Sequence, residues 1–161
     1  MVETVASAKL ATKMNSQVKD GSPVGVLVQV NTSGEDNKSG VDMESTLGLV
    51  KHIKESCPRL KFCGLMTIGD LGNSVAASTE GDNPDFLKLR QVRKKISEDL
   101  KLDESDLELS MGMSKDFEDA IRLGSTNVRV GSSIFGGRSY PPKPVSTSDN
   151  VTDKLEKIEI K

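Results

Sequence analysis

The hydrophobic residues of this chain alternate between short continuous runs and longer stretches with helical spacing. Residues 24–30 form the clearest run, which is typical of a parallel strand covered on both faces. Apolar residues then recur at helical spacing over residues 47–57, and Pro58 follows where such a helix should have ended. The pattern therefore predicts a buried strand followed by an amphipathic helix.

The same alternation continues along the rest of the chain. Further strands are predicted at residues 1–5, 60–68, 107–111 and 126–130, and further helices at residues 8–14, 86–100 and 114–123. Ser114 can cap the last of these helices, and Gly124 stands where it should end. Strands separated by helices imply β-α crossovers and a parallel sheet, so the predicted fold class is α/β.

The number of units leaves two architectures open. A complete (β/α)8 barrel takes about 250 residues, so a chain of 161 residues holds about five of the eight units. This count fits either a small open sheet or part of a barrel. We assign residues 1–140 to this domain and interpret residues 141–161, which are rich in Pro, Ser and Thr and then charged, as a flexible tail.

Composition narrows the class of protein. The 22 basic and 24 acidic residues are scattered and only 3% of residues are aromatic, so we do not expect a nucleic-acid partner. No apolar run approaches the ~20 residues of a membrane-spanning helix, and the first twenty residues are too polar for a signal peptide; we expect a cytosolic protein. A single histidine and two cysteines, Cys57 and Cys63, indicate neither a metal site nor a disulfide framework.

The strongest chemical signal lies where two successive predicted strands end. Residues 110–114 (Ser-Met-Gly-Met-Ser) lead into a helix, and residues 131–133 (Gly-Ser-Ser) follow the next strand. Glycine lets backbone amides approach an anion, serine adds hydroxyl donors, and a helix N-terminus adds unpaired N–H groups. Taken singly, each loop is better explained by Ser114 capping its helix and by glycines turning the chain. Together, the two loops favour a phosphate site.

Arg129 lies inside an otherwise apolar predicted strand. Alternation places Arg129 on one face of the sheet and Val128 and Val130 on the other. If the valines pack under helices, the guanidinium points into the interior, where it requires hydrogen-bond acceptors. Two interpretations are equally supported at this point: a ligand accepts from Arg129, or Arg129 forms a structural salt bridge for which Glu108 is a candidate partner.

Other features of the sequence do not indicate a site by themselves. Residues 34–40 contain the letters of a nucleotide-binding phosphate loop in the wrong order and are interpreted as a polar loop. His52 lacks a positioned nucleophile and is interpreted as a surface or boundary residue. Met66, Met111 and Met113 either flank a pocket near these loops or fill core space.

Three segments, residues 64–69, 108–116 and 124–136, resemble the pyridoxal phosphate homeostasis protein family and follow one another in the order found in that family. Residues 28–35 and 83–86 are similar to the eukaryotic members, and the resemblance runs from residue 1 to about residue 140. It implies a partial (β/α)8 barrel of the alanine racemase N-terminal-domain type, with about the last five β/α units present. It also implies pyridoxal 5′-phosphate (PLP) as the cofactor.

The resemblance implies roles for particular residues. Ser114, Gly131 and Ser132 would hold the phosphate, with Met113 and Met66 beside the cofactor, and Arg129 would face the pyridine nitrogen. A guanidinium there disfavours protonation of that nitrogen and weakens the ring as an electron sink. The implied function is therefore a non-catalytic carrier or regulator of PLP in vitamin B6 homeostasis, with apo forms of PLP-dependent enzymes as partners.

The sequence departs from the family at its start. In the family, the lysine that forms the Schiff base with PLP lies on the first barrel strand, about three β/α units before Met1 of this chain. Lys9 and Lys13 lie on a predicted helix and do not replace it. We therefore expect a shortened eukaryotic member in which PLP binding is noncovalent or lost. The alternatives are a racemase-like PLP-dependent enzyme and a truncated isoform that acts through protein contacts, including self-association at exposed barrel edges.

Overall fold

The computed structural model describes residues 1–19, 21–35, 39–70 and 82–137. The described residues contain a five-stranded parallel sheet with the order β1-β2-β3-β4-β5. The strands are β1 (Val2–Val5), β2 (Val24–Gln29), β3 (Leu60–Met66), β4 (Glu108–Met113) and β5 (Asn127–Arg129). The helices are α1 (Ala8–Gln17), α2 (Thr46–Ser56), α4 (Pro84–Leu100), α5 (Phe117–Arg122) and the single turn α6 (Ser132–Phe135), with a 3₁₀ turn, η1, at Glu104–Asp106.

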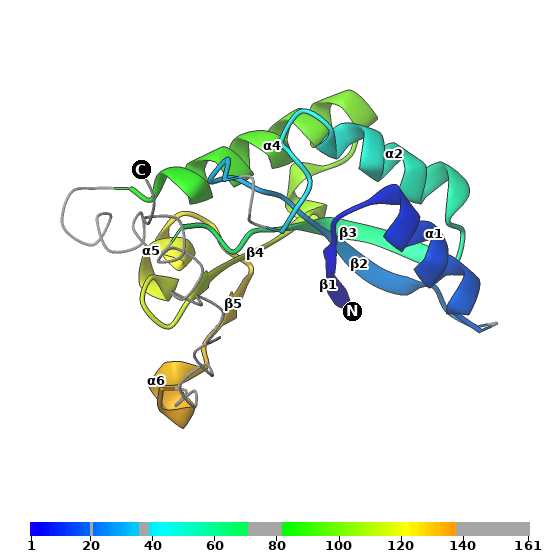
Figure 1. The fold of residues 1–161 in the computed structure, drawn as a ribbon. Coiled ribbons are helices and arrows are strands. Elements are labelled where there is room, and N and C mark those ends of the chain that lie inside the picture. Colours follow the sequence, from blue (N-terminus) through cyan, green and yellow to red (C-terminus); the bar gives the residue numbers. More distant parts are fainter. Residues whose placement is uncertain (20, 36–38, 71–81, 138–161) are drawn as a thin grey trace, which may run out of the picture.

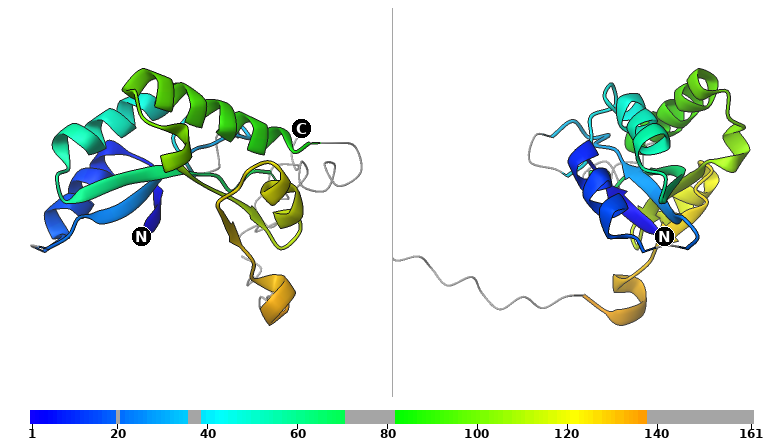
Figure 2. Two further views of the ribbon diagram at one scale, coloured as in Figure 1. Left: turned by 180° about the vertical axis from the view of Figure 1, so that it is seen from behind. Right: turned by 90° about the vertical axis from the view of Figure 1, so that its right-hand side faces the viewer.

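The order of the strands decides between an open sheet and a barrel. Strand order follows chain order without reversal, and α1, α2 and α4 all lie on the same side of a curved sheet (Figures 1 and 2). In a doubly wound sheet the order reverses, and helices cover both faces. The five strands therefore form a half-barrel, and the predictions of an α/β class and of a partial barrel are confirmed.

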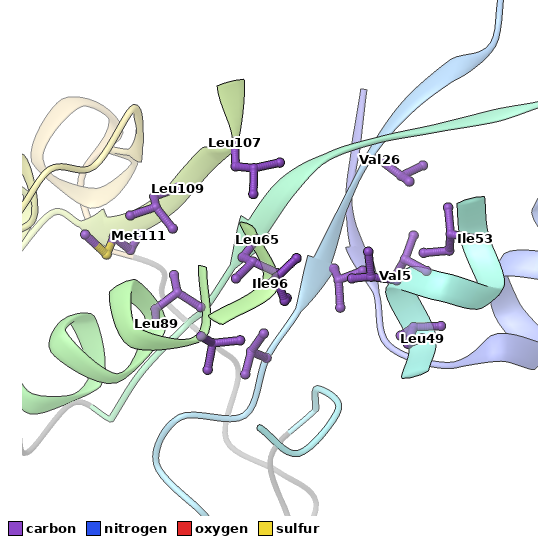
Figure 3. Packing of buried hydrophobic residues seen from close by; sticks show 14 of the residues in the cluster. Val5, Val26, Leu49, Ile53, Leu65, Leu89, Ile96, Leu107, Leu109 and Met111 are labelled. Carbon is purple, nitrogen blue, oxygen red and sulfur yellow. The ribbon is translucent and has the colours of Figure 1, made fainter. Parts of the chain in front are cut away.

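The main hydrophobic core lies between the convex face of the sheet and the helices. Val26, Val28 and Val30 alternate along β2 toward this layer and are almost fully buried. Figure 3 shows how Leu89 and Ile96 of α4 pack near Leu65 of β3. The strand and helix periodicities in the sequence thus identified this core correctly.

α4 begins two residues before the apolar stripe that predicted it. The side-chain oxygen of Asn83 accepts a hydrogen bond from the backbone N–H of Asp85 at 2.9 Å and caps the helix. Pro84 occupies the first turn, where its missing N–H leaves no helical bond unmade. The segment 83–86 therefore fixes the start of the helix.

Strand β3 contains a bulge at Cys63. Phe62 and Gly64 face consecutive residues of β2, so Cys63 is left over in the pairing. Gly64 has a φ of +154°, and a Cβ atom added there would lie 2.6 Å from the backbone nitrogen of Glu108 on β4. Glycine is required at this position because β3 and β4 approach each other there without room for a side chain.

Replacing this glycine tests the bulge. Gly64→Ala is expected to lower the free energy of unfolding by more than about 1 kcal/mol, because alanine is strained at this φ and collides with β4. The matched control is Gly48→Ala on α2, where an added Cβ meets nothing within 4 Å and should raise stability by up to about 1 kcal/mol. Urea unfolding followed by circular dichroism measures both; equal effects would contradict the assigned role of Gly64.

One expectation lies outside the described residues, namely the flexible tail predicted at residues 141–161. The described residues also leave out residues 71–81, between β3 and α4. Among the helices that the structure does describe, none has the length and apolar character needed to cross a membrane.

Candidate functional site

Ser114 joins the loops that follow β4 and β5. Its hydroxyl oxygen accepts hydrogen bonds from the backbone N–H groups of Gly131, at 3.1 Å, and of Ser133, at 3.3 Å. The Ser133 hydroxyl donates back to the Ser114 carbonyl at 3.4 Å, and Ser132 lies exposed between the two amides. The structure therefore brings together three of the residues singled out from sequence, Ser114, Gly131 and Ser132, at the carboxyl edge of two neighbouring strands.

Ser114 does not cap α5, so the interpretation of Ser114 as a helix cap is wrong. The helix begins at Phe117 with Asp116 at its N-cap, and Asp116 Oδ1 accepts from the backbone N–H of Met113 at 2.6 Å. A hydroxyl has two acceptor positions and one hydrogen. Because both amides use the oxygen of Ser114 as an acceptor, its hydrogen takes no part in these two bonds.

Arg129 lies on the concave face of the half-barrel. Its Nη1 donates to Ser110 Oγ at 2.7 Å and its Nη2 donates to the carbonyl of Thr67 at 2.8 Å. Val128 packs against the helix-side core, so the alternation predicted for this strand is correct. The acceptors are thus Ser110 and Thr67 in place of Glu108, the partner considered from sequence.

The surroundings of Arg129 shift its pKa but leave it charged. Burial lowers the pKa of its guanidinium, while the negative charges of Glu3 and Asp116 raise it. Guanidinium groups have pKa values so high that they stay protonated in proteins. Arg129 therefore presents a permanent, partly buried positive charge to the concave face.

Glu3 of β1 is a polar residue of this site that the sequence analysis missed. Its Oε2 accepts from Ser110 Oγ at 2.6 Å and its Oε1 accepts from the side-chain amide of Asn127 at 2.7 Å. Three strand spacings separate β1 from β4, roughly 14 Å in a flat sheet. The contact requires a strongly curved sheet. A charged residue in an otherwise apolar short strand, the signal used for Arg129, could have found Glu3.

The three methionines considered from sequence have different positions. Leu65 faces the helices, so Met66, which is 3% exposed, points to the concave face. Met113 is half-buried at the end of β4, next to Ser114. Met111 belongs to the core between sheet and helices, so the pocket interpretation is wrong for Met111, which fills core space.

A pocket of about 250 Å³ lies at the carboxyl ends of β2 and β3. The hydroxyls of Thr32 and Thr67 are 2.9 Å apart in its wall, and Thr67 is also the residue whose carbonyl accepts from Arg129. A larger hollow of about 410 Å³, lined in part by Lys61 and Glu108, lies at the amino ends of β3 and β4. The smaller pocket adjoins the concave polar cluster, whereas the larger one lies at the opposite edge of the sheet.

The remaining residues that could carry chemistry lie away from this edge. His52 of α2 is half-buried, with its Nε2 at 2.9 Å from Thr12 Oγ1 on α1, which agrees with a boundary position. Cys57 and Cys63 are free, and burial raises the pKa of the Cys57 thiol. Within the described ranges, no cluster of His, Cys, Asp and Glu side chains could hold a metal ion.

These features together define a class of protein. A curved parallel sheet with its helices on one face, and with polar loops at the carboxyl ends of its strands, is the ligand-binding arrangement of (β/α)8 barrels. Residues 1–139 match the family model described as alanine racemase, N-terminal domain, and the chain belongs to this family.

Two curated relatives are more similar to the chain than the family model alone indicates. A mouse protein named pyridoxal phosphate homeostasis protein is 52% identical over 147 residues, which cover 89% of this chain and 53% of the relative. Its human counterpart is 49% identical, with 89% and 52% covered. The chain therefore spans about half the length of the curated relatives it matches.

A solved structure supports the same fold. PipY of Synechococcus elongatus, solved without PLP, is 26% identical with a TM-score of 0.65, and the match covers 83% of this chain and 60% of PipY. PipY solved with PLP bound gives a TM-score of 0.61 at 24% identity over 83% and 59% of the two chains.

Removing the Ser114 hydroxyl tests the link between the two loops. Ser114→Ala is expected to speed hydrogen exchange of the Gly131 and Ser133 amides by about two- to tenfold, because each loses a hydrogen bond worth about 0.5–1.5 kcal/mol. The amide of Gly124, which donates to the Ile121 carbonyl, should exchange at its original rate. Exchange measured by NMR would contradict the link if Gly131 and Ser133 were unaffected.

Proposed function

We propose that this chain binds PLP noncovalently at the carboxyl edge of β4 and β5 and serves PLP homeostasis without turning over a substrate. The observation that carries the proposal is the Ser114 hydroxyl, which is held by the amides of two residues from the neighbouring loop. The names of the mouse and human relatives and the PLP-bound structure of PipY support PLP as the ligand.

The loops fit a phosphate group. Ser114 has a hydroxyl hydrogen to donate, Ser132 contributes an exposed hydroxyl, and the backbone at Gly131 is accessible because an added Cβ would meet nothing within 4 Å. Backbone amides and hydroxyls that donate to an anion give charge-assisted hydrogen bonds, which are stronger than neutral ones. We therefore assign the phosphate of PLP to the hydroxyls of Ser114 and Ser132. Gly131, whose N–H is donated to Ser114, leaves open space for the anion, and Met113 lies at the border of the site.

Arg129 fits the ring end of the same ligand and favours a carrier over a catalyst. When bound, PLP supplies an electrophilic aldehyde and an electron-withdrawing pyridine ring. A permanent positive charge beside the ring nitrogen disfavours its protonation and weakens that electron withdrawal. Arg129, held by Ser110 and Thr67, would then orient the ring, with the buried Met66 as a neighbour on the concave face.

Three of the lysines in the described residues are poorly placed to form a Schiff base, in keeping with a noncovalent mode. Lys9 and Lys13 are exposed on α1, in the outer helix layer. Lys88 of α4 donates to the carbonyl of Thr32 at 2.8 Å and lies 3.8 Å from a carboxylate oxygen of Asp85. Its amine is engaged in these two contacts, whereas an amine that attacks the aldehyde of PLP must leave such partners.

Thermal unfolding with two ligands tests the proposed function. PLP at a hundredfold excess over its Kd should stabilise the chain by about 2.7 kcal/mol, and pyridoxal, which lacks the phosphate, should give a much smaller shift. Ser114→Ala and Arg129→Met should each weaken PLP binding by about tenfold. The control Arg122→Met removes an exposed guanidinium of α5 that pairs with Asp119 and should leave PLP binding unchanged. Equal shifts from PLP and pyridoxal would contradict the phosphate site.

A second candidate function is association through α6. Ile134 and Phe135 are 67% and 85% exposed beside the Ser114 loop, and exposed apolar side chains favour contact with another surface. We propose self-association of the chain as the second role of this edge, with an apo PLP-dependent enzyme as a further partner.

Sedimentation velocity tests that association. The wild-type sedimentation coefficient should rise with protein concentration, and Phe135→Ser should reduce the rise because it removes the most exposed aromatic side chain of α6. The control Ile121→Ser changes a residue of α5 that is 55% exposed and should behave as wild type. A monomer at every concentration would contradict this role.

A further inference from the structure

A directed chain of hydrogen bonds crosses the concave face from β5 to β1. Arg129 Nη1 donates to Ser110 Oγ at 2.7 Å, and Ser110 Oγ donates to Glu3 Oε2 at 2.6 Å. Guanidinium groups donate only and ionised carboxylates accept only. The direction of the chain is therefore fixed: the single hydroxyl hydrogen of Ser110 faces Glu3, and a lone pair of the same oxygen faces Arg129.

Glu3 is held on both sides. Its second carboxylate oxygen, Oε1, accepts from the side-chain amide of Asn127 at 2.7 Å. Ser110 is fully buried, and Glu3, Asn127 and Arg129 are half-buried. In such a site a hydroxyl with its hydrogen turned the wrong way would leave a charged donor without its acceptor, which is costly. The carboxylate of Glu3 is the group that prevents this.

We propose that Glu3 is a positioning residue for the ring-binding end of the site. By fixing the orientation of the Ser110 hydroxyl, it holds the Arg129 guanidinium in position to contact the nitrogen of a pyridine ring. This inference rests on the proposed PLP-binding function and adds a residue more than a hundred positions away from the phosphate loops. Glu3 accepts from Ser110 and Asn127, whereas Ser114 accepts from Gly131 and Ser133, so the proposal separates ring recognition from phosphate recognition.

The separation gives a test with two ligands. Glu3→Gln keeps the shape of the side chain but replaces one acceptor with a donor, so with the Asn127 amide in its present orientation Ser110 and Asn127 cannot both donate to it. Ser110→Ala removes the link while leaving the carboxylate in place. In the full chain, both variants should lower the affinity for PLP by about five- to tenfold and leave the affinity for inorganic phosphate within about twofold of wild type.

Glu108→Gln is the matched control. It is the same substitution at a half-buried glutamate of β4 that lines the hollow at the opposite edge of the sheet, and it should change neither affinity. Circular dichroism of every variant confirms folding before binding is measured. Parallel losses for PLP and inorganic phosphate would assign Glu3 a structural role only, and unchanged PLP affinity in both Glu3→Gln and Ser110→Ala would overturn the proposal.

A ligand-free measurement separates this inference from the proposed function. The guanidinium protons of Arg129 should exchange slowly with solvent in the NMR spectrum of the wild type and faster in Glu3→Gln, with no change in Glu108→Gln. If the wild-type chain binds no PLP, the proposed function fails, and the guanidinium exchange alone decides whether Glu3 positions Arg129. Equal exchange in wild type and Glu3→Gln would then overturn the inference.

Discussion

The curvature of the parallel sheet is the constraint on which the rest of this structure depends. Helices pack on one face, so the opposite face must either meet solvent or fill its own interior. In this chain, polar side chains occupy part of the concave face. Glu3 of β1 accepts hydrogen bonds there from Ser110 of β4 and Asn127 of β5. Curvature thereby provides acceptors for the half-buried charge of Arg129, which would be costly to bury without them.

The same curvature places two different kinds of chemistry next to each other. At the carboxyl edge, the hydroxyls of Ser114 and Ser132 offer neutral donors suited to an anion, beside the open backbone of Gly131. On the concave face, Arg129 offers a fixed positive charge whose orientation is set by Ser110 and Thr67. A ligand with a phosphate at one end and an aromatic ring at the other matches this division, because each end meets its own set of partners.

The site lies on a sheet whose two terminal strands are open to pairing on one side. β1 and β5 are the terminal strands, each paired on one side within the described residues. Unpaired strand edges can accept further strands. The curated relatives are about twice as long as the matched part of this chain. The phosphate loops follow β4 and β5, and therefore lie close to β5, one of the two terminal strands of the sheet.

The sequence by itself determined the type and order of the elements. Continuous apolar runs such as residues 24–30 and helical periodicity over residues 86–100 are local signals, and the alternation around Arg129 correctly gave its face of the sheet. The sequence also indicated that the loops after β4 and β5 belong together, because neighbouring parallel strands end at one edge.

The pattern of residues left an open sheet and a half-barrel equally possible; the family resemblance implied the half-barrel, and the strand order of the structure confirmed it. Only the tertiary structure showed Ser114 bonded to Gly131 in place of its expected capping role, and Glu3 bonded to Ser110. The half-barrel and the bond between Glu3 and Ser110 depend on how far the sheet curls, whereas Ser114 and Gly131 meet because β4 and β5 are neighbouring strands. Curvature arises from the summed twist of five strands and the packing of helices against them. No local pattern records a hydrogen bond between residues 107 positions apart.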